Sequence, residues 1–117
     1  MNFIDNEYLL PIFIGSSRAN LKIARCIRKQ FGIKGHSFAS CHGIRDRLTY
    51  RCHKVCPMRD ELLALSLQAF YDQLEDYFCP VIVVCDEGAR DMIARIRQEI
   101  EYAYIITEAT ALLSGSC

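Results

Sequence analysis

The sequence lacks a net charge, a long apolar run and a recognisable signal peptide. Its 14 basic and 14 acidic side chains balance, which argues against a general affinity for nucleic acid or for a membrane surface. The longest apolar stretch is far shorter than a membrane-spanning helix requires. We therefore expect a cytoplasmic protein that binds no nucleic acid and no membrane.

Acidic residues are missing from one long segment. Between Tyr8 and Arg45, every ionisable side chain other than His and Cys is basic, and most carboxylates come after Asp60. Two interpretations of this asymmetry remain open: an anion site near the first helix, or a helix face exposed to solvent. The basic residues are Arg18, Lys22, Arg25, Arg28, Lys29, Lys34 and Arg45.

Cysteine is abundant, but the spacing Cys-x-x-Cys does not occur. The seven cysteines are odd in number, and we expect reduced thiols rather than a disulfide framework. One cluster has the ligand types that zinc prefers, although its spacing fits neither a zinc ribbon nor a finger. A zinc site therefore stays open beside a metal-free loop, while a Cys-His catalytic pair would lack an orienting third group. The cluster consists of Cys41, His42, Cys52, His53 and Cys56.

The length and the apolar content predict one folded domain. The chain has 117 residues, half of them apolar, which is enough for a core without disulfide support. We expect residues 1–8 to be a polar leader and residues 9–117 to form a single α/β domain. Apolar runs predict strands, and three- and four-residue spacing predicts helices. The strands are expected at 9–14, 33–39, 53–56, 81–85 and 102–106, and the helices at 17–31, 60–77 and 89–100, with a short last helix capped by Thr107.

Alternating strands and helices of this kind require a mainly parallel sheet with helices on both faces. The architecture predicted is a three-layer α/β domain with a sheet of four to five strands. Ligands of such sheets bind beyond the carboxyl ends of the strands. Two turns lie at that edge: Gly15-Ser16-Ser17, and Asp86-Glu87-Gly88.

The first turn has features of a binding loop. Gly15 permits close approach of a ligand, the following helix offers free N–H groups to an anion, and Ser16, Ser17 and Asn20 add uncharged donors. However, Ser17 and Asn20 stand where a dinucleotide-binding fingerprint has its second and third glycines. A tight turn that needs Gly15 for steric reasons is the alternative.

The second turn and one helical arginine are further candidates. Asp86 and Glu87 can bind a ribose hydroxyl, an amine or a cation, or can simply stabilise the dipole of the following helix. Arg25 can pair with a ligand or remain in water. The residue types alone do not decide between these roles.

The first strand, turn and helix resemble the amino-terminal domain of ATP-grasp carboxylate-amine ligases, the group that includes D-aspartate ligase. The matching residues are Leu10-Pro11-Ile12, Gly15, Asn20, Ala24-Arg25 and Phe31-Gly32-Ile33. The later family pattern of a strand, an acidic turn and a helix is matched by Pro80 to Cys85, Asp86-Glu87, Arg97-Gln98-Glu99-Ile100 and Thr107-Glu108-Ala109. This chain has Ser16-Ser17 where a second glycine is usual.

The resemblance implies a Rossmann-like, pre-ATP-grasp fold. It also implies that the two turns would line a cleft for a small carboxylate or amine substrate, formed by Gly15, Ser16, Ser17, Asn20, Arg25, Asp86 and Glu87. ATP and magnesium would belong to the complete enzyme, and a separate ATP-grasp domain would hold them, so this chain alone is expected to be inactive. The alternative is a stand-alone module that binds a nucleotide or metabolite, or that forms a homodimer through an apolar sheet edge.

Overall fold

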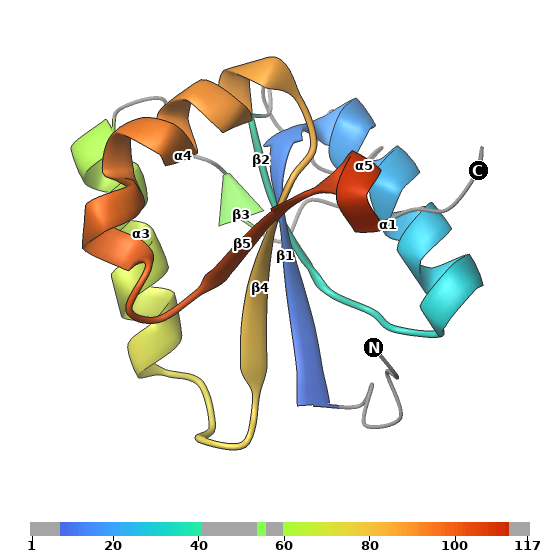
Figure 1. Ribbon diagram of the computed structural model, residues 1–117, viewed down its shortest axis with the longest axis horizontal. Coiled ribbons are helices and arrows are strands. Elements are labelled where there is room, and N and C mark those ends of the chain that lie inside the picture. The colour runs from blue at the N-terminus through green and yellow to red at the C-terminus, as the bar shows by residue number, and fades with distance from the viewer. Residues whose placement is uncertain (1–7, 41–53, 56–59, 113–117) are drawn as a thin grey trace.

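A parallel β-sheet runs through the centre of the computed structural model, which describes residues 8–40, 54–55 and 60–112 (Figure 1). The neighbouring strands are parallel throughout, in the order β3-β2-β1-β4-β5. Since β3 has only two residues, four strands make up most of the sheet. This is the strand order of a Rossmann-like fold. The strands are β1 (Leu9–Ser16), β2 (His36–Ser40), β3 (Lys54–Val55), β4 (Cys79–Val84) and β5 (Ile105–Glu108).

Helices cover both faces of the sheet, which confirms the predicted three-layer α/β architecture. α3 and α4 lie on one face, and α1 lies on the other with the short α5 beside it (Figure 1). Alternate residues of β1 supply the two cores: Ile12 and Ile14 pack with α3 and α4, whereas Phe13 packs with α1. The helices are α1 (Ser17–Phe31), α3 (Asp60–Asp72), α4 (Glu87–Ile100) and α5 (Ala109–Leu112).

β1 is the central strand, which explains its continuous apolar sequence, since helices bury both of its faces. Pro11 is accommodated near its start. The carbonyl oxygen of Pro11 faces Gly35, and in a strand the backbone nitrogen points to the same side as the carbonyl. Pairing of β1 with β2 begins only at Ile12, so the N–H that Pro11 lacks would lie outside the ladder.

α1 begins and ends where its sequence signals predict. The Ser16 hydroxyl accepts a hydrogen bond from the Ala19 N–H at 3.2 Å and so caps the helix. At the other end, Gly32 adopts a left-handed φ of 70° and donates its N–H to the Arg28 carbonyl. That conformation costs glycine far less than other residues.

The apolar spacing overestimates the length of α3, which ends at Asp72 and not near Tyr77. The Gln73 and Leu74 N–H groups bond to carbonyls three residues back, so the chain tightens into a turn. Tyr77 is 59% exposed and lies edge-on to Tyr8. Tyr77 continues the apolar spacing of the helix in the sequence, but it lies beyond the end of α3.

The last strand begins later than the sequence predicts, at Ile105 and not at Tyr102. Residues predicted to start the final strand instead form a turn, in which the Ala103 and Tyr104 N–H groups bond to the Ile100 carbonyl. The buried Tyr104 hydroxyl donates to the Leu67 carbonyl at 2.6 Å and ties this turn to α3. Thr107 consequently lies inside β5 and does not cap α5.

The cysteine prediction is correct only in part. Cys79 and Cys85 carry free thiols, as expected, but Cys26 is disulfide-bonded. Among the described residues, no helix is long and apolar enough to cross a membrane. The predicted polar leader, apart from Tyr8, lies outside the described residues.

Candidate functional site at the carboxyl edge of the sheet

The two predicted turns meet at the carboxyl edge, between β1 and β4. After β1 the chain passes to β2 on one side, whereas β4 and β5 lie on the other, so this is the switch point at which Rossmann-like sheets bind ligands. Asp86 joins the turns across 70 residues of sequence, because its Oδ2 accepts the Ser16 N–H at 2.8 Å. Its Oδ1 accepts the Ala89 N–H at 2.8 Å and caps α4.

Gly15 is required at this junction for steric reasons. A Cβ at position 15 would lie 3.0 Å from Asp86 Oδ2, 3.1 Å from Asn20 Oδ1 and 3.1 Å from Cys85 Cβ. These separations are shorter than ordinary van der Waals contacts. The sequence predicted that Gly15 either allows a ligand to approach or is needed for steric reasons. In the structure, the groups that approach Gly15 closely are side chains of this chain.

Asn20 lies beneath the same turn and is fully buried, at 0% exposure. Its Nδ2 donates to the Phe13 carbonyl at 3.0 Å, the Phe38 carbonyl at 3.1 Å and the Ser37 hydroxyl at 2.9 Å. The amide therefore connects α1 to both β1 and β2. Its Oδ1 has no hydrogen-bond donor within reach among the described residues.

The remaining predicted site residues lie in different settings. Ser17 is buried in the first turn of α1, and Glu87 is exposed in the first turn of α4. Gly88, predicted as part of the turn, is already helical. Arg25 is exposed and stands eight residues after Ser17, about 12 Å along the helix, so it is not brought to the turns.

The basic side chains of α1 are exposed to solvent. Arg18, Lys22, Arg25, Arg28 and Lys29 are all exposed along the helix. Meanwhile the N–H groups nearest the turn are already bonded, with Ser16 donating to Asp86 and Ala19 to the Ser16 hydroxyl. The anion site suggested by the charge asymmetry has fewer free donors than the sequence implies.

Sequence reasoning missed an ion pair at this edge and did not count the Cys85 thiol among the candidate site residues. Arg90 pairs with Glu108 at the end of β5, and Glu108 lies opposite Val84 in the sheet register. The sequence signal was the position of Glu108 at the end of a strand, but the shifted prediction for β5 concealed it. Cys85, the residue after β4, donates its N–H to the Ile14 carbonyl.

Cys85 is poorly suited to act as a nucleophile. Burial, and next the negative charge of Asp86, raise the pKa of its thiol from 9.0 to about 12. The neutral thiol lies 3.5 Å from the Val83 carbonyl, to which it donates. Since the thiolate is the reactive form, the raised pKa lowers the expected reactivity of this thiol at neutral pH.

This inertness leads to a first prediction. In the native protein at pH 8, we expect iodoacetamide to modify Cys85 far more slowly than Cys79, because a rise of about three pKa units lowers the thiolate fraction roughly a thousandfold. Peptide mapping by mass spectrometry gives the two rates, and in urea the rates should become similar. Rapid native modification of Cys85 would contradict its burial beside Asp86.

The candidate zinc ligands Cys41, His42, Cys52, His53 and Cys56 all lie outside the described residues. Within residues 8–40, 54–55 and 60–112, no group of three or more His, Cys, Asp or Glu side chains is arranged to hold a metal ion. The zinc hypothesis therefore stays a prediction. Metal analysis of protein purified without added zinc would test it.

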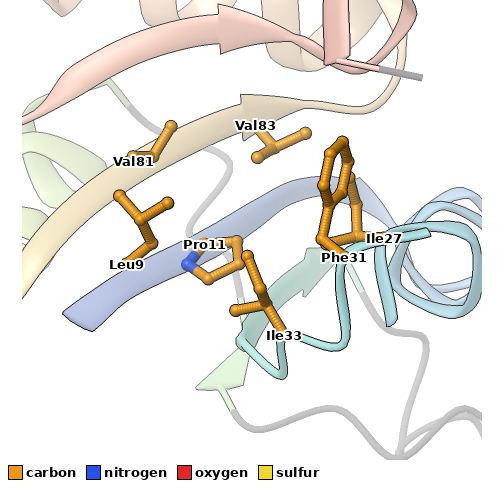
Figure 2. Close-up of a pocket in the computed structure, with 7 residues that line it drawn as sticks. All are labelled: Leu9, Pro11, Ile27, Phe31, Ile33, Val81 and Val83. Atoms are coloured by element: carbon orange, nitrogen blue, oxygen red, sulfur yellow. The ribbon is translucent and has the colours of Figure 1, made fainter. Parts of the chain in front are cut away.

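The structure also contains an apolar pocket near the amino ends of β1 and β4 (Figure 2). Apart from the ring nitrogen of Pro11, the side chains drawn around it are hydrocarbon. Its volume of about 60 Å³ is well below the roughly 300–1,000 Å³ of ligand pockets. Its location at the opposite end of the strands separates it from the Asp86 junction. The lining residues are Leu9, Pro11, Ile27, Phe31, Ile33, Val81 and Val83.

The fold is that of a Rossmann-like α/β domain, and a polar junction around Asp86 lies at its switch point. No family model matches the chain, and no curated protein and no solved structure is significantly similar to it.

Proposed function

We propose that this chain is the amino-terminal, substrate-side domain of an ATP-dependent carboxylate-amine ligase and that it is not catalytic alone. The observation that carries the proposal is the Asp86 bridge between the turns after β1 and β4. In such a ligase ATP activates a carboxylate as an acyl phosphate, which an amine then attacks. This domain would form one wall of the cleft that holds a small carboxylate or amine substrate.

The arrangement of the resembling segments supports this proposal. The first segment coincides with β1 and α1, including the Gly32 cap, and the later one coincides with β4, Asp86 and α4. These segments are far apart in sequence, yet their strands are neighbours in the sheet. In a ligase of this family, both segments would line the same cleft. Their proximity in this chain is therefore what the proposal expects.

ATP and magnesium fit poorly on the described residues. The Asp86 carboxylate stands at the turn that a phosphate would approach, and like charges repel. No candidate metal cluster occurs among the side chains that the structure describes. We therefore assign both groups to an ATP-grasp domain, in the same polypeptide or in a complex with it.

The genomic sequence downstream of Cys117 tests the proposal. We expect an ATP-grasp reading frame continuous with, or next to, the one that encodes this chain. Co-expression of the two parts should give ADP release that depends on both a carboxylate and an amine, whereas this chain alone should release none. A gene that ends at Cys117 without such a neighbour, or an assembled pair without ADP release, would refute the assignment.

A stand-alone binding or dimerisation module is the second candidate. It is favoured by apolar surface on the edge strand β5, where Ile105 is 57% exposed. Light scattering would detect the stable dimer that this candidate predicts. Calorimetry with ATP, ADP and amino acids would separate a dimerisation role from metabolite binding.

A further inference from the structure

The outer face of α3 carries more apolar surface than an exposed helix requires. Leu62 and Leu65 are 46% and 60% exposed, although Leu63 and Leu67 already pack into the core from the same helix. Ala69, four residues after Leu65, is exposed as well. Since residues three and four apart are neighbours on a helix, Leu62, Leu65 and Ala69 form one apolar stripe, the α3 stripe. A helix that is apolar on both sides is typical of one that is covered on both sides.

The α3 stripe has a negatively charged border. Glu61 lies four residues before Leu65, and Asp72 lies three residues after Ala69; both carboxylates are exposed. α3 contains no Lys or Arg. A surface that covers this stripe should therefore combine an apolar centre with a positively charged border.

The pocket on the α1 face of the sheet offers such a centre (Figure 2). Three of its lining side chains, Leu9, Phe31 and Val81, are only partly buried, so the pocket is open to the surface. Its hydrocarbon lining gives water no hydrogen-bond partner. Its volume of about 60 Å³ suits a few carbon atoms rather than a metabolite. An aliphatic side chain from outside fits this description.

The border of this pocket is positively charged. Arg28 directly follows Ile27 of the lining. Lys34 directly follows Ile33, and both cations are exposed, as is Lys29 beside Arg28. α1 contains no Asp or Glu, and in the described part of the chain no carboxylate forms an ion pair with these three side chains. The described residues therefore leave the positive border without a counter-charge.

We propose that a second copy of this chain covers the α3 stripe. Leu65 enters the pocket on the α1 face of that copy, while Glu61 and Asp72 face its basic border. The chain itself supplies both complementary surfaces. Because acidic and basic side chains are equal in number, two copies do not repel each other through their net charge.

The two surfaces lie on opposite faces of the sheet, because α3 packs on one face and the pocket lies beside α1 on the other (Figure 1). The contact is therefore heterologous, and each pair of copies keeps one stripe and one pocket uncovered. Chains or rings of more than two copies follow. Neither surface includes the Asp86 junction, so the inference does not rest on the ligase assignment.

Sedimentation velocity of the native 117-residue chain tests the inference. At low salt we expect the mean mass to rise with concentration beyond that of a dimer. At about 1 M salt the screening length falls to about 3 Å, and association should weaken roughly tenfold because the charged borders are screened. A chain that is monomeric at every concentration, or that stops at a dimer insensitive to salt, would overturn the inference.

Leu65→Ala removes the side chain that enters the pocket and should weaken association roughly tenfold. Ile105→Ala is the matched control, because Ile105 is exposed to nearly the same extent, 57% against 60%, but lies on the edge strand β5. The control should associate like the native chain. Loss of association with Ile105→Ala and not with Leu65→Ala would place the contact at the sheet edge and remove the proposed one.

Charge reversal tests the two borders together. The pocket variant Arg28→Glu/Lys34→Glu and the stripe variant Glu61→Lys/Asp72→Lys should each stay monomeric, because like charges would then face each other. Mixed in equal amounts they should associate again, since each stripe then meets a pocket of opposite charge. Circular dichroism shows whether each variant is folded, and folded variants that fail to associate when mixed would contradict the inference. If a variant does not fold, the native chain and Leu65→Ala still decide the outcome.

Discussion

Gly35→Ala is expected to lower the free energy of unfolding by about 3 kcal/mol or more, because overpacking against fixed atoms costs about 1–3 kcal/mol and occasionally more. A Cβ at position 35 would lie only 2.2 Å from the carbonyl oxygen of Pro11 and 2.9 Å from the ring of Phe13. The clash involves backbone of the central strand, which cannot rotate away as a side chain can. Urea denaturation followed by circular dichroism measures the change.

Gly88→Ala is the matched control for this prediction. The nearest atom to its added Cβ is Asp86 Oδ1 at 3.6 Å, an ordinary contact. Since Gly88 lies in the first turn of α4, alanine should raise the free energy of unfolding by about 0.4–1 kcal/mol. If both variants lose the same stability, the close packing of Gly35 on β1 is wrong.

Local patterns in the sequence were sufficient to predict the first strand and the first helix. β1, the Ser16 cap, α1 and the Gly32 end follow from apolar runs, hydroxyl placement and glycine, all of which act over a few residues. The apolar run of β4 likewise reveals a buried strand. The parallel pairing of the strands agrees with the helices α1, α3 and α4, each of which connects one described strand to the next.

Contacts between distant residues were beyond this reasoning. The bond from Ser16 to Asp86 spans 70 residues, and the one from Tyr104 to Leu67 spans 37. The first determines how the two turns meet, and the second displaces the start of β5. The periodicity of α3 likewise could not show that the chain would turn after Asp72.

The candidate site was predicted in composition but not in electrostatic character. The residue types at the first turn suggested an anion site, because a helix N-terminus follows a glycine. The structure places the Asp86 carboxylate there, bonded to the turn's own N–H group. The same carboxylate accepts from the first turn of α4 and so stabilises the junction between the two turns.

Asn20→Leu should show how much the sheet depends on the buried amide. Leucine has a similar volume but cannot donate to the Phe13 and Phe38 carbonyls. We expect the free energy of unfolding to fall by roughly 1–3 kcal/mol for each carbonyl left short of a donor. Ser37→Ala, which removes the third acceptor of the amide and leaves both carbonyls with their donor, is the comparison and should cost less than Asn20→Leu.

Asn20→Asp tests the role of the amide as a hydrogen-bond donor separately from its packing, because aspartate and asparagine have nearly the same shape. An ionised carboxylate at position 20 would face two carbonyls in a buried setting, so its pKa should rise above the unfolded value of about 3.9. A raised pKa means that the substitution costs least stability, relative to the native protein, below about pH 4 and costs more as the pH rises and the carboxyl ionises. Denaturation of the variant and the native protein at pH 4 and pH 7 should therefore show a larger deficit at pH 7. An equal deficit at both values would mean that no donor is needed at position 20.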